Sequence, residues 1–123
     1  MSILVGKHIK SVLSRLERKV KGGIYLEGLN READFPYMIF SYTVQPDEGT
    51  KDGGTYNCNV NINIYSLDGD SSIELAEEVR KEMEDSDYVY DDFIILSSEF
   101  VSYRGALDGD VYTRELEFNI KTY

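Results

Sequence analysis

The sequence has a single cysteine, a single histidine, two prolines and no tryptophan among its 123 residues. One cysteine cannot form an intrachain disulfide. Cys58 falls on the apolar side of an alternating segment, so we expect a small buried side chain in a reduced, intracellular setting. His8 has no second histidine with which to share a metal ion, which argues against a zinc site built on histidines. These residue types therefore predict no metal site and no cofactor.

Long hydrophobic runs are also missing. Lys7, His8 and Lys10 interrupt the N-terminal segment early, so neither a secretory signal nor a membrane span is expected there. Positive charge is scarce as well, because 13 lysines and arginines face 23 acids, for a formal net charge of −10 at pH 7. Each contact with a nucleic-acid phosphate needs a cation, so specific nucleic-acid binding is not expected.

The few positive charges are unevenly distributed. Residues 1–21 carry six lysines and arginines and one acid, for a charge of +5, whereas the other 102 residues carry seven cations and 22 acids, for −15. A basic end on an acidic body lets one copy present its basic element to the acidic surface of the next. Packing of the basic element on its own domain is equally allowed.

The pattern that is most clearly present is a strict alternation from Tyr56 to Tyr65. Every second residue in Asn57–Ile64 is apolar and the others are asparagine, which is typical of a strand with one buried face. Asparagine does not titrate, so this strand suits recognition or assembly better than proton transfer. A chain of this length is predicted to be one domain, residues 1–123.

The first element is predicted to be an amphipathic helix from about Ile3 to Val20, ended by Gly22-Gly23. Its apolar stripe comprises Val5, Ile9, Val12, Leu13, Leu16 and Val20, with His8 near the edge. Lys7, Lys10, Arg18 and Lys21 cluster on the far side of the helix. Three interpretations remain open: a helix packed on its own core with a solvated basic face, a protein-interface helix, and a membrane-surface helix, which the acidic body disfavours.

The remaining elements predict an α+β fold. Strands are expected over Tyr37–Val44, Tyr56–Tyr65, Phe93–Arg104 and Val111–Thr122, and a helix from a Ser71–Glu74 capping box to Glu84 with Ile73, Ala76, Val79 and Met83 inward. Ile24-Tyr25-Leu26 is either a short strand or an extended segment. The order α-β-β-α-β-β indicates an antiparallel sheet of about four strands with two helices packed on one face.

Residues 45–54 form a long polar connection between two predicted strands. Asp47, Glu48, Lys51 and Asp52 lie in it together with a double glycine, so we expect a flexible loop. Long loops on small domains are often functional, and these four residues are candidates for contact with a partner.

No catalytic constellation is visible. Asp68-Gly69-Asp70 opens like a calcium loop, but the sixth position is Ile73 rather than glycine and the twelfth is Val79 rather than glutamate. The glycine pairs do not open a helix, so they form no phosphate loop. No serine lies in a nucleophile elbow, and the one histidine lies on the first helix. The sequence therefore does not predict an enzyme.

Several short motifs follow one another along the chain: a leading helix, Ile24-Tyr25, Phe35-Pro36-Tyr37, Ile64-Tyr65-Ser66, and a helix of Glu-Leu-Ala-Glu-Glu-Val type from Glu74 to Val79. In this order and spacing they resemble the tail-completion, or tail-terminator, proteins of long-tailed bacteriophages and prophages, over most of the chain. The resemblance implies a structural protein without catalytic residues. It implies a ring, commonly a hexamer, that caps the head-proximal end of the tail tube, stops tube polymerisation and offers a surface to the head–tail connector.

That resemblance also implies partners and a location. The partners are further copies of the chain, the tail tube protein and the connector protein, and the location is the host cytoplasm during assembly and then the virion tail. Whether the free protein is a ring or a monomer stays open. A ring contact joins two different faces, for which Lys7, Lys10, Arg18 and Lys21 are the candidate residues on the basic side.

An alternative of another class is a small ligand-binding or regulatory α+β module. The ten tyrosines are compatible with a metabolite pocket between sheet and helices, although tyrosine also lines protein interfaces. The chain lacks a convergent set of cations that would orient an acidic metabolite, which favours the assembly role.

Overall fold

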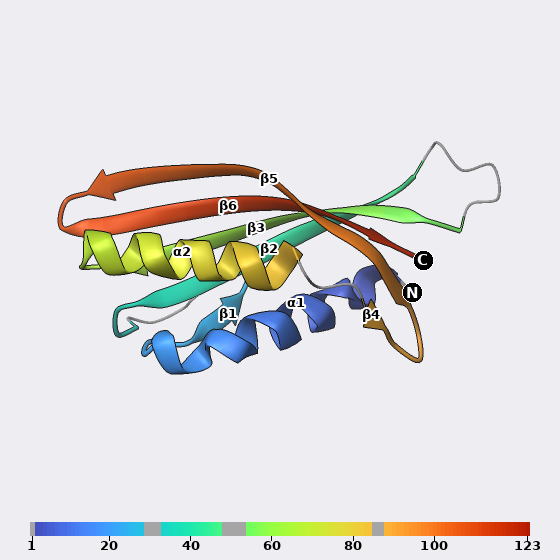
Figure 1. Ribbon diagram of the computed structural model, residues 1–123, viewed down its shortest axis with the longest axis horizontal. Coiled ribbons are helices and arrows are strands. Elements are labelled where there is room, and N and C mark those ends of the chain that lie inside the picture. Colours follow the sequence, from blue (N-terminus) through green and yellow to red (C-terminus); the bar gives the residue numbers. More distant parts are fainter. Residues whose placement is uncertain (1, 29–32, 48–53, 85–87) are drawn as a thin grey trace.

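The computed structural model describes residues 2–28, 33–47, 54–84 and 88–123. Its centre is a six-stranded sheet in the order β1-β2-β3-β6-β5-β4, curled into a half-barrel. Figure 1 shows the long strands running the length of the molecule, with α2 lying along the sheet and α1 beside α2. The elements in chain order are the 3-10 turn η1 (Ser2–Leu4), α1 (Val5–Leu13), the 3-10 helix η2 (Ser14–Lys19), β1 (Ile24–Leu26), β2 (Tyr37–Pro46), β3 (Tyr56–Ser66), α2 (Gly69–Glu84), β4 (Tyr88–Val89), β5 (Ile94–Asp108) and β6 (Val111–Thr122).

The predicted fold class is wrong in three respects. The described chain forms six strands rather than four, because Ile24–Leu26 and Tyr88–Val89 also join the sheet. The sheet is mixed, since β1 pairs with β2 in parallel whereas every other pair is antiparallel. It is also a curled half-barrel rather than an antiparallel layer with two helices on one face. Strands this long twist strongly, and two bulges in β5 add to the bend.

The asparagine-rich strand β3 has the predicted buried face. Cys58, Val60, Ile62 and Ile64 are fully buried, whereas the asparagines between them lie on the other face. On that outer face Asn119 Nδ2 of β6 donates to Asn59 Oδ1 over 3.3 Å. The asparagines thus link neighbouring strands, and the apolar partners build the core.

The first helix keeps its predicted stripe but not its predicted continuity. All six apolar residues of the stripe are buried, yet the segment is divided into η1, α1 and η2. At the junction of α1 and η2 the Ser14 hydroxyl donates to the carbonyl of Lys10 at 2.7 Å, which competes with regular helical bonding. His8 is not at the border: it is 1% exposed, and its Nδ1 lies 2.7 Å from the hydroxyl of Tyr90.

Helix α2 begins two residues earlier than predicted, because its N-terminal cap is Asp68. The Asp68 carboxylate accepts the backbone N–H of Asp70 at 3.1 Å and the Ser71 hydroxyl at 2.8 Å. Ile73, predicted to face the core, is 52% exposed, and Ser72 and Leu75 are buried instead. Ala76, Val79 and Met83 are buried as predicted, so the inward stripe differs from the prediction only at its N-terminal part.

We predict that Asp68→Ala lowers the unfolding temperature by several degrees, because it removes the cap of α2, whereas Asp68→Asn keeps most of the cap. Hydrogen bonds from Ser71 hold the pKa of Asp68 below its usual value. A depressed folded-state pKa contributes stability that is present above the usual aspartate pKa and lost as pH falls through the folded-state pKa. The unfolding temperatures of the wild type and of Asp68→Asn, measured from neutral to acidic pH, should therefore converge at low pH. A gap that does not change with pH would contradict the contribution of the ionised carboxylate, and an unchanged unfolding temperature of Asp68→Ala would contradict the capping role.

Strand β5 is longer than predicted. It runs to Asp108, so the expected turn over residues 105–110 is a two-residue loop, Gly109-Asp110. Gly109 has a φ of +60°, which glycine adopts freely at the first position of a type II′ hairpin turn. The register with β6 shifts at Leu96 and Val101, and the strand is exposed from Val101 to its end.

Candidate assembly surface

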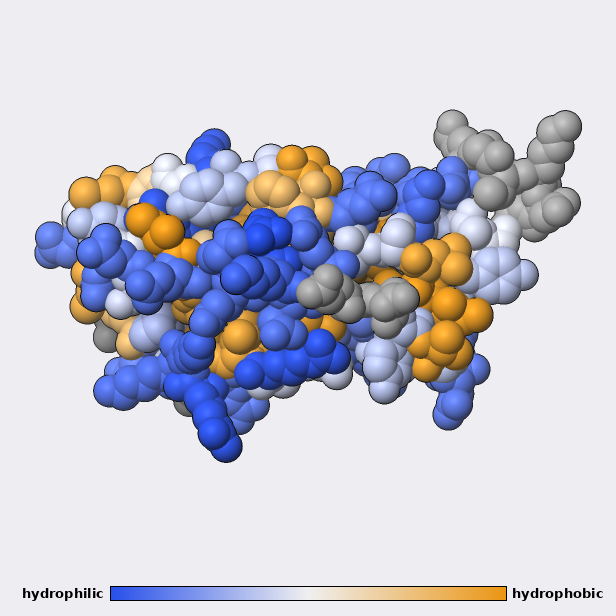
Figure 2. Space-filling view, viewed as in Figure 1, coloured by the Kyte–Doolittle hydropathy of each residue, from blue (hydrophilic) through white to orange (hydrophobic). Residues whose placement is uncertain are grey.

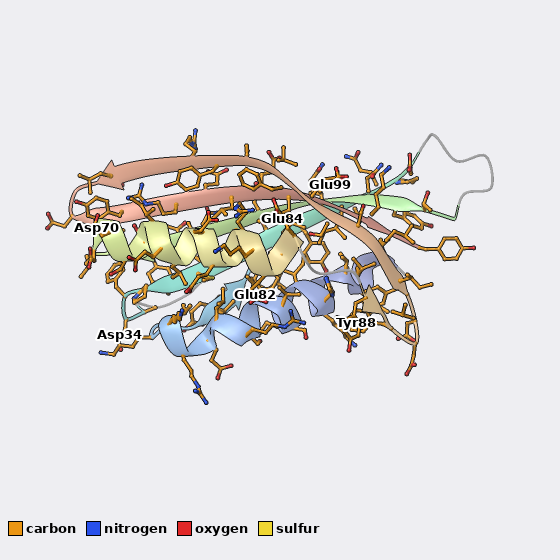
Figure 3. The ribbon with its side chains drawn as sticks, in the orientation of Figure 1. Asp34, Asp70, Glu82, Glu84, Tyr88 and Glu99 are labelled. Carbon is orange, nitrogen blue, oxygen red and sulfur yellow. The ribbon has the colours of Figure 1, made fainter. Side chains whose placement is uncertain are left out.

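Part of the basic N-terminal segment packs against the acidic helix of the same chain. Arg15 Nη1 lies 3.2 Å from Glu82 Oε2, and the ammonium of Lys19 is bonded to the carboxylate of Glu78. Figure 3 shows Glu82 on the part of α2 next to α1. Both pairs are at least one-third exposed, so each contributes little to stability, and both join η2 to α2.

The candidate cations Lys7, Lys10, Arg18 and Lys21 are all exposed. Lys10 Nζ donates to the carbonyl of Ile24 at 3.0 Å, at the start of β1. Within the described ranges no ion pair involves Lys7, Arg18 or Lys21. These three charges therefore remain available to a partner.

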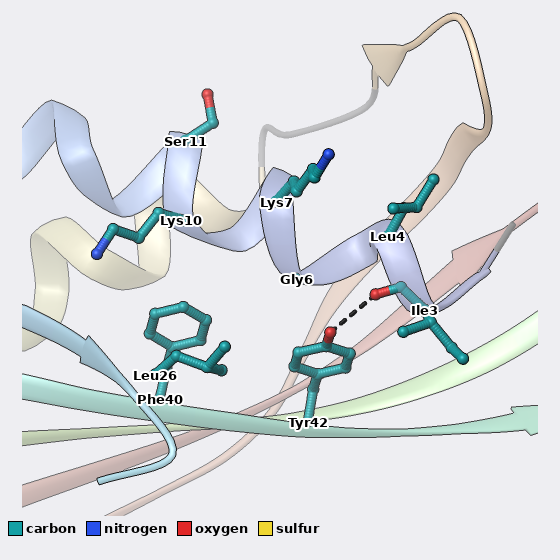
Figure 4. A pocket seen from close by; sticks show the side chains of 9 residues that line it. All are labelled: Ile3, Leu4, Gly6, Lys7, Lys10, Ser11, Leu26, Phe40 and Tyr42. Atoms are coloured by element: carbon teal, nitrogen blue, oxygen red, sulfur yellow. Dashed lines mark hydrogen bonds between the residues drawn. The ribbon is translucent and has the colours of Figure 1, made fainter. Parts of the chain in front are cut away.

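A groove of about 680 Å³ runs between α1 and the neighbouring strands β1 and β2 at one edge of the sheet. Figure 4 shows its walls, with Lys7, Lys10 and Ser11 projecting from α1 and with Leu26, Phe40 and Tyr42 coming from the two strands. The Tyr42 hydroxyl donates to the carbonyl of Ile3 at 2.8 Å and so ties β2 to the start of the chain. Burial, with a smaller contribution from Glu27, raises the pKa of Tyr42, so the phenol stays neutral at physiological pH.

The structure brings only some of the candidate cations together. Lys7 and Lys10 share the groove, and Lys10 and Lys21 line a second hollow of about 390 Å³ beside Gly23 and Ile24. Arg18 lines neither of these two hollows. The basic face predicted from helical periodicity is thus divided, with its N-terminal part at the groove.

The candidate contact loop lies mostly outside the described residues. Glu48, Lys51 and Asp52 belong to that part of the chain. Asp47 is described, and its backbone N–H donates to the carbonyl of Thr55 at 3.0 Å. Gln45 and Pro46, expected in the loop, are paired with Asn57 and Tyr56 in the ladder between β2 and β3.

The sequence reasoning missed a second surface, the outer end of the β5–β6 hairpin. Val101, Tyr103 and Leu107 are 53%, 45% and 58% exposed, although all three lie in a strand. Asp108 and Asp110 flank Gly109 at the tip. The signal was present, because Leu107 interrupts an otherwise small and polar turn sequence from Gly105 to Asp110. Figure 2 shows other hydrophobic atoms gathered at the end of the molecule that carries the N-terminus and β4.

Chemistry of other kinds has little support in the described part of the chain. There, no three histidine, cysteine or acidic side chains are grouped closely enough to hold a metal ion. Burial raises the pKa of the Cys58 thiol to about 11, so it is a poor nucleophile at neutral pH. Among the described helices, none combines the length and the apolar character that crossing a membrane requires.

Comparison with known proteins shows a shared fold. No protein-family model matches the chain. No curated protein matches it either. A chain of the virion of a native gene transfer agent particle superposes with a TM-score of 0.77, at 14% identity, over 93% of this chain and 90% of that one. A second solved structure has a TM-score of 0.71 at 10% identity, over 100% of this chain and 96% of that one. At such identities the likeness concerns the fold alone.

Proposed function

We propose that this protein is a structural component of a virion or a virion-like particle and is not an enzyme. The observation that carries the proposal is the fold shared with a chain of a gene transfer agent particle over nearly the full length of both chains. The motifs that resemble tail-completion proteins point the same way. A surface of unpaired cations, an apolar groove and an exposed hairpin suits assembly better than catalysis.

We further propose the specific role of a tail terminator. The chain acts as a single domain that forms a ring, commonly of six copies, at the head-proximal end of the tail tube. The ring contacts the tube protein on one side and the connector on the other. Its net negative charge keeps packaged DNA from adhering to it, which suits a conduit. The protein gathers in the host cytoplasm and is then retained in the particle.

The test is to prepare particles from a producing host with and without the gene for this chain. We expect tails of irregular length and heads without tails when the chain is missing, and normal particles when the wild-type gene is restored. Electron microscopy of negatively stained particles measures both. Normal joined particles in its absence would contradict the virion role.

The groove is the one observation that favours the alternative, a ligand-binding module. Its volume of about 680 Å³ is within the range of small-molecule sites, and most of its lining residues are apolar. It is, however, an open groove at the edge of a sheet, with two lysines on its rim. That geometry fits a protruding protein segment better than an enclosed metabolite.

A further inference from the structure

The edge of β2 beside the groove has backbone groups that β1 does not reach. Met38 N–H donates to the carbonyl of Gly23 at 3.0 Å, and the carbonyl of Phe40 accepts from Glu27 N–H at 2.7 Å, so these two residues direct their polar groups toward β1. Pairing ends at Leu26 and Phe40. Because a strand repeats every two residues, the backbone groups of Tyr42 face the same edge beyond that last pair. An edge of this kind can accept an added strand.

The residues that line the groove next to this edge would suit a partner segment that carries an apolar side chain and acidic side chains beside it. Leu26 is 47% exposed and Ile3 is 57% exposed, so a large apolar side chain placed there would bury surface on both. Lys7 and Lys10 are exposed on the α1 side (Figure 4). The Lys10 ammonium is held by the Ile24 carbonyl, which keeps its charge at the rim.

The tip of the β5–β6 hairpin has the complementary composition. Leu107 is 58% exposed and is followed at once by Asp108 and, after Gly109, by Asp110. Neither aspartate is in an ion pair with a described residue; the nearest pair along the hairpin is Arg104 with Glu115, at 3.2 Å. One apolar side chain flanked by two free acids thus matches an apolar groove flanked by two lysines.

The two surfaces lie toward opposite ends of the molecule. Figure 1 shows the tip of the hairpin at one end of the long axis, and the N-terminal part of α1, which walls the groove, toward the other. One chain therefore cannot bring its own tip to its own groove. A contact between tip and groove would therefore have to join two copies, and because it joins two different faces it would build a ring where the rotation between copies closes.

We propose that the hairpin tip of one copy docks in the groove between α1 and β2 of a second copy. Leu107 enters the groove against Leu26, and Asp108 and Asp110 approach the lysines Lys7 and Lys10. This rests on the proposed function in that it names the contact that holds the ring together. It also divides the predicted basic face: Lys7 and Lys10 belong to the contact, and Arg18 and Lys21 do not.

The experiment is a charge swap, read as molecular mass against concentration by sedimentation velocity. Lys7→Glu with Lys10→Glu, and separately Asp108→Lys with Asp110→Lys, should each raise the concentration needed for assembly about tenfold or more, because each opposes like charges. All four changes in one chain should restore assembly. Arg18→Glu with Lys21→Glu makes the same change in net charge outside the groove and should assemble as the wild type does.

Circular dichroism establishes that each variant is folded, which is expected because the changed positions are exposed. The proposal is overturned by a wild type that stays a single copy at every concentration. It is equally overturned if the folded variant with all four changes does not regain assembly. The same holds if Arg18→Glu with Lys21→Glu raises the concentration needed for assembly as much as the changes at the groove do. A chain that stays single yet is required for normal particles would refute this contact and leave the virion role standing.

Discussion

Replacing Gly22 with alanine is expected to destabilise the protein by more than about 3 kcal/mol, which is a large fraction of the stability of an ordinary domain. A Cβ at this position would lie 1.6 Å from the carbonyl oxygen of Asp34 and 3.0 Å from the Cβ of Tyr37. Both neighbours are backbone or backbone-attached, so no side-chain rotation relieves the overlap. The N–H of Gly22 also donates to the carbonyl of Pro36 at 2.8 Å, which holds the two segments together.

The matched control is Gly28→Ala. A Cβ added there meets no described atom within 4 Å, and its backbone is not in the left-handed region. Urea unfolding of the two variants should show a large loss of stability at Gly22 and a change within about 0.5 kcal/mol at Gly28. Equal, small effects would show that the turn after η2 can move away from Asp34 at little cost.

Phe118→Ala is the second large expected effect, a loss of about 3–5 kcal/mol. Phe118 is fully buried in β6, where it is paired with Val60 of β3 on one side and Phe100 of β5 on the other. Its ring meets that of Phe100 edge to face at a centroid distance of 5.8 Å. Truncation leaves a cavity between three strands that the long, mutually bonded ladders cannot easily close.

Val101→Ala provides the comparison, because Val101 lies at a bulge of β5 and is 53% exposed. We expect its unfolding free energy to stay within about 0.5 kcal/mol of that of the wild type. Denaturant titration followed by circular dichroism measures both variants. A loss below about 1 kcal/mol for Phe118→Ala would mean that the strands around this ring can repack.

The elements with strong periodicity were predicted well from the sequence. The alternation in β3 identified its buried face, and the stripe of the first helix identified six core residues, because burial of one face leaves a regular mark in the sequence. Weak signals gave errors. Three residues at Ile24–Leu26 cannot reveal a parallel direction, and Tyr88–Val89 lies in an acidic stretch that masks a short strand.

Helix α2 shows a different kind of limit. Ile73 and the buried Ser72 both have helical spacing to Ala76, Val79 and Met83. Spacing therefore cannot distinguish the two positions, and the prediction favoured Ile73 because it is the larger apolar residue. The sequence also indicated Lys7 and Lys10 as candidate interface residues but did not predict a groove beside them. The groove is assembled from the first helix, from β1 and from β2, and only the parallel pairing of β1 brings these segments together.

The strand order has a consequence for how the protein is made. β6 is the last strand along the chain, yet it lies between β3 and β5, and its pairs with β3 join residues as far apart as Tyr56 and Thr122. During synthesis the edge of β3 that pairs with β6 therefore stays unpaired until residue 122 has left the ribosome. Long-range pairing of this kind slows folding, so the sheet closes only after translation of β6 is complete. A chain stalled on the ribosome before β6 would have an incomplete sheet, because β3 and β5 would lack the strand that lies between them.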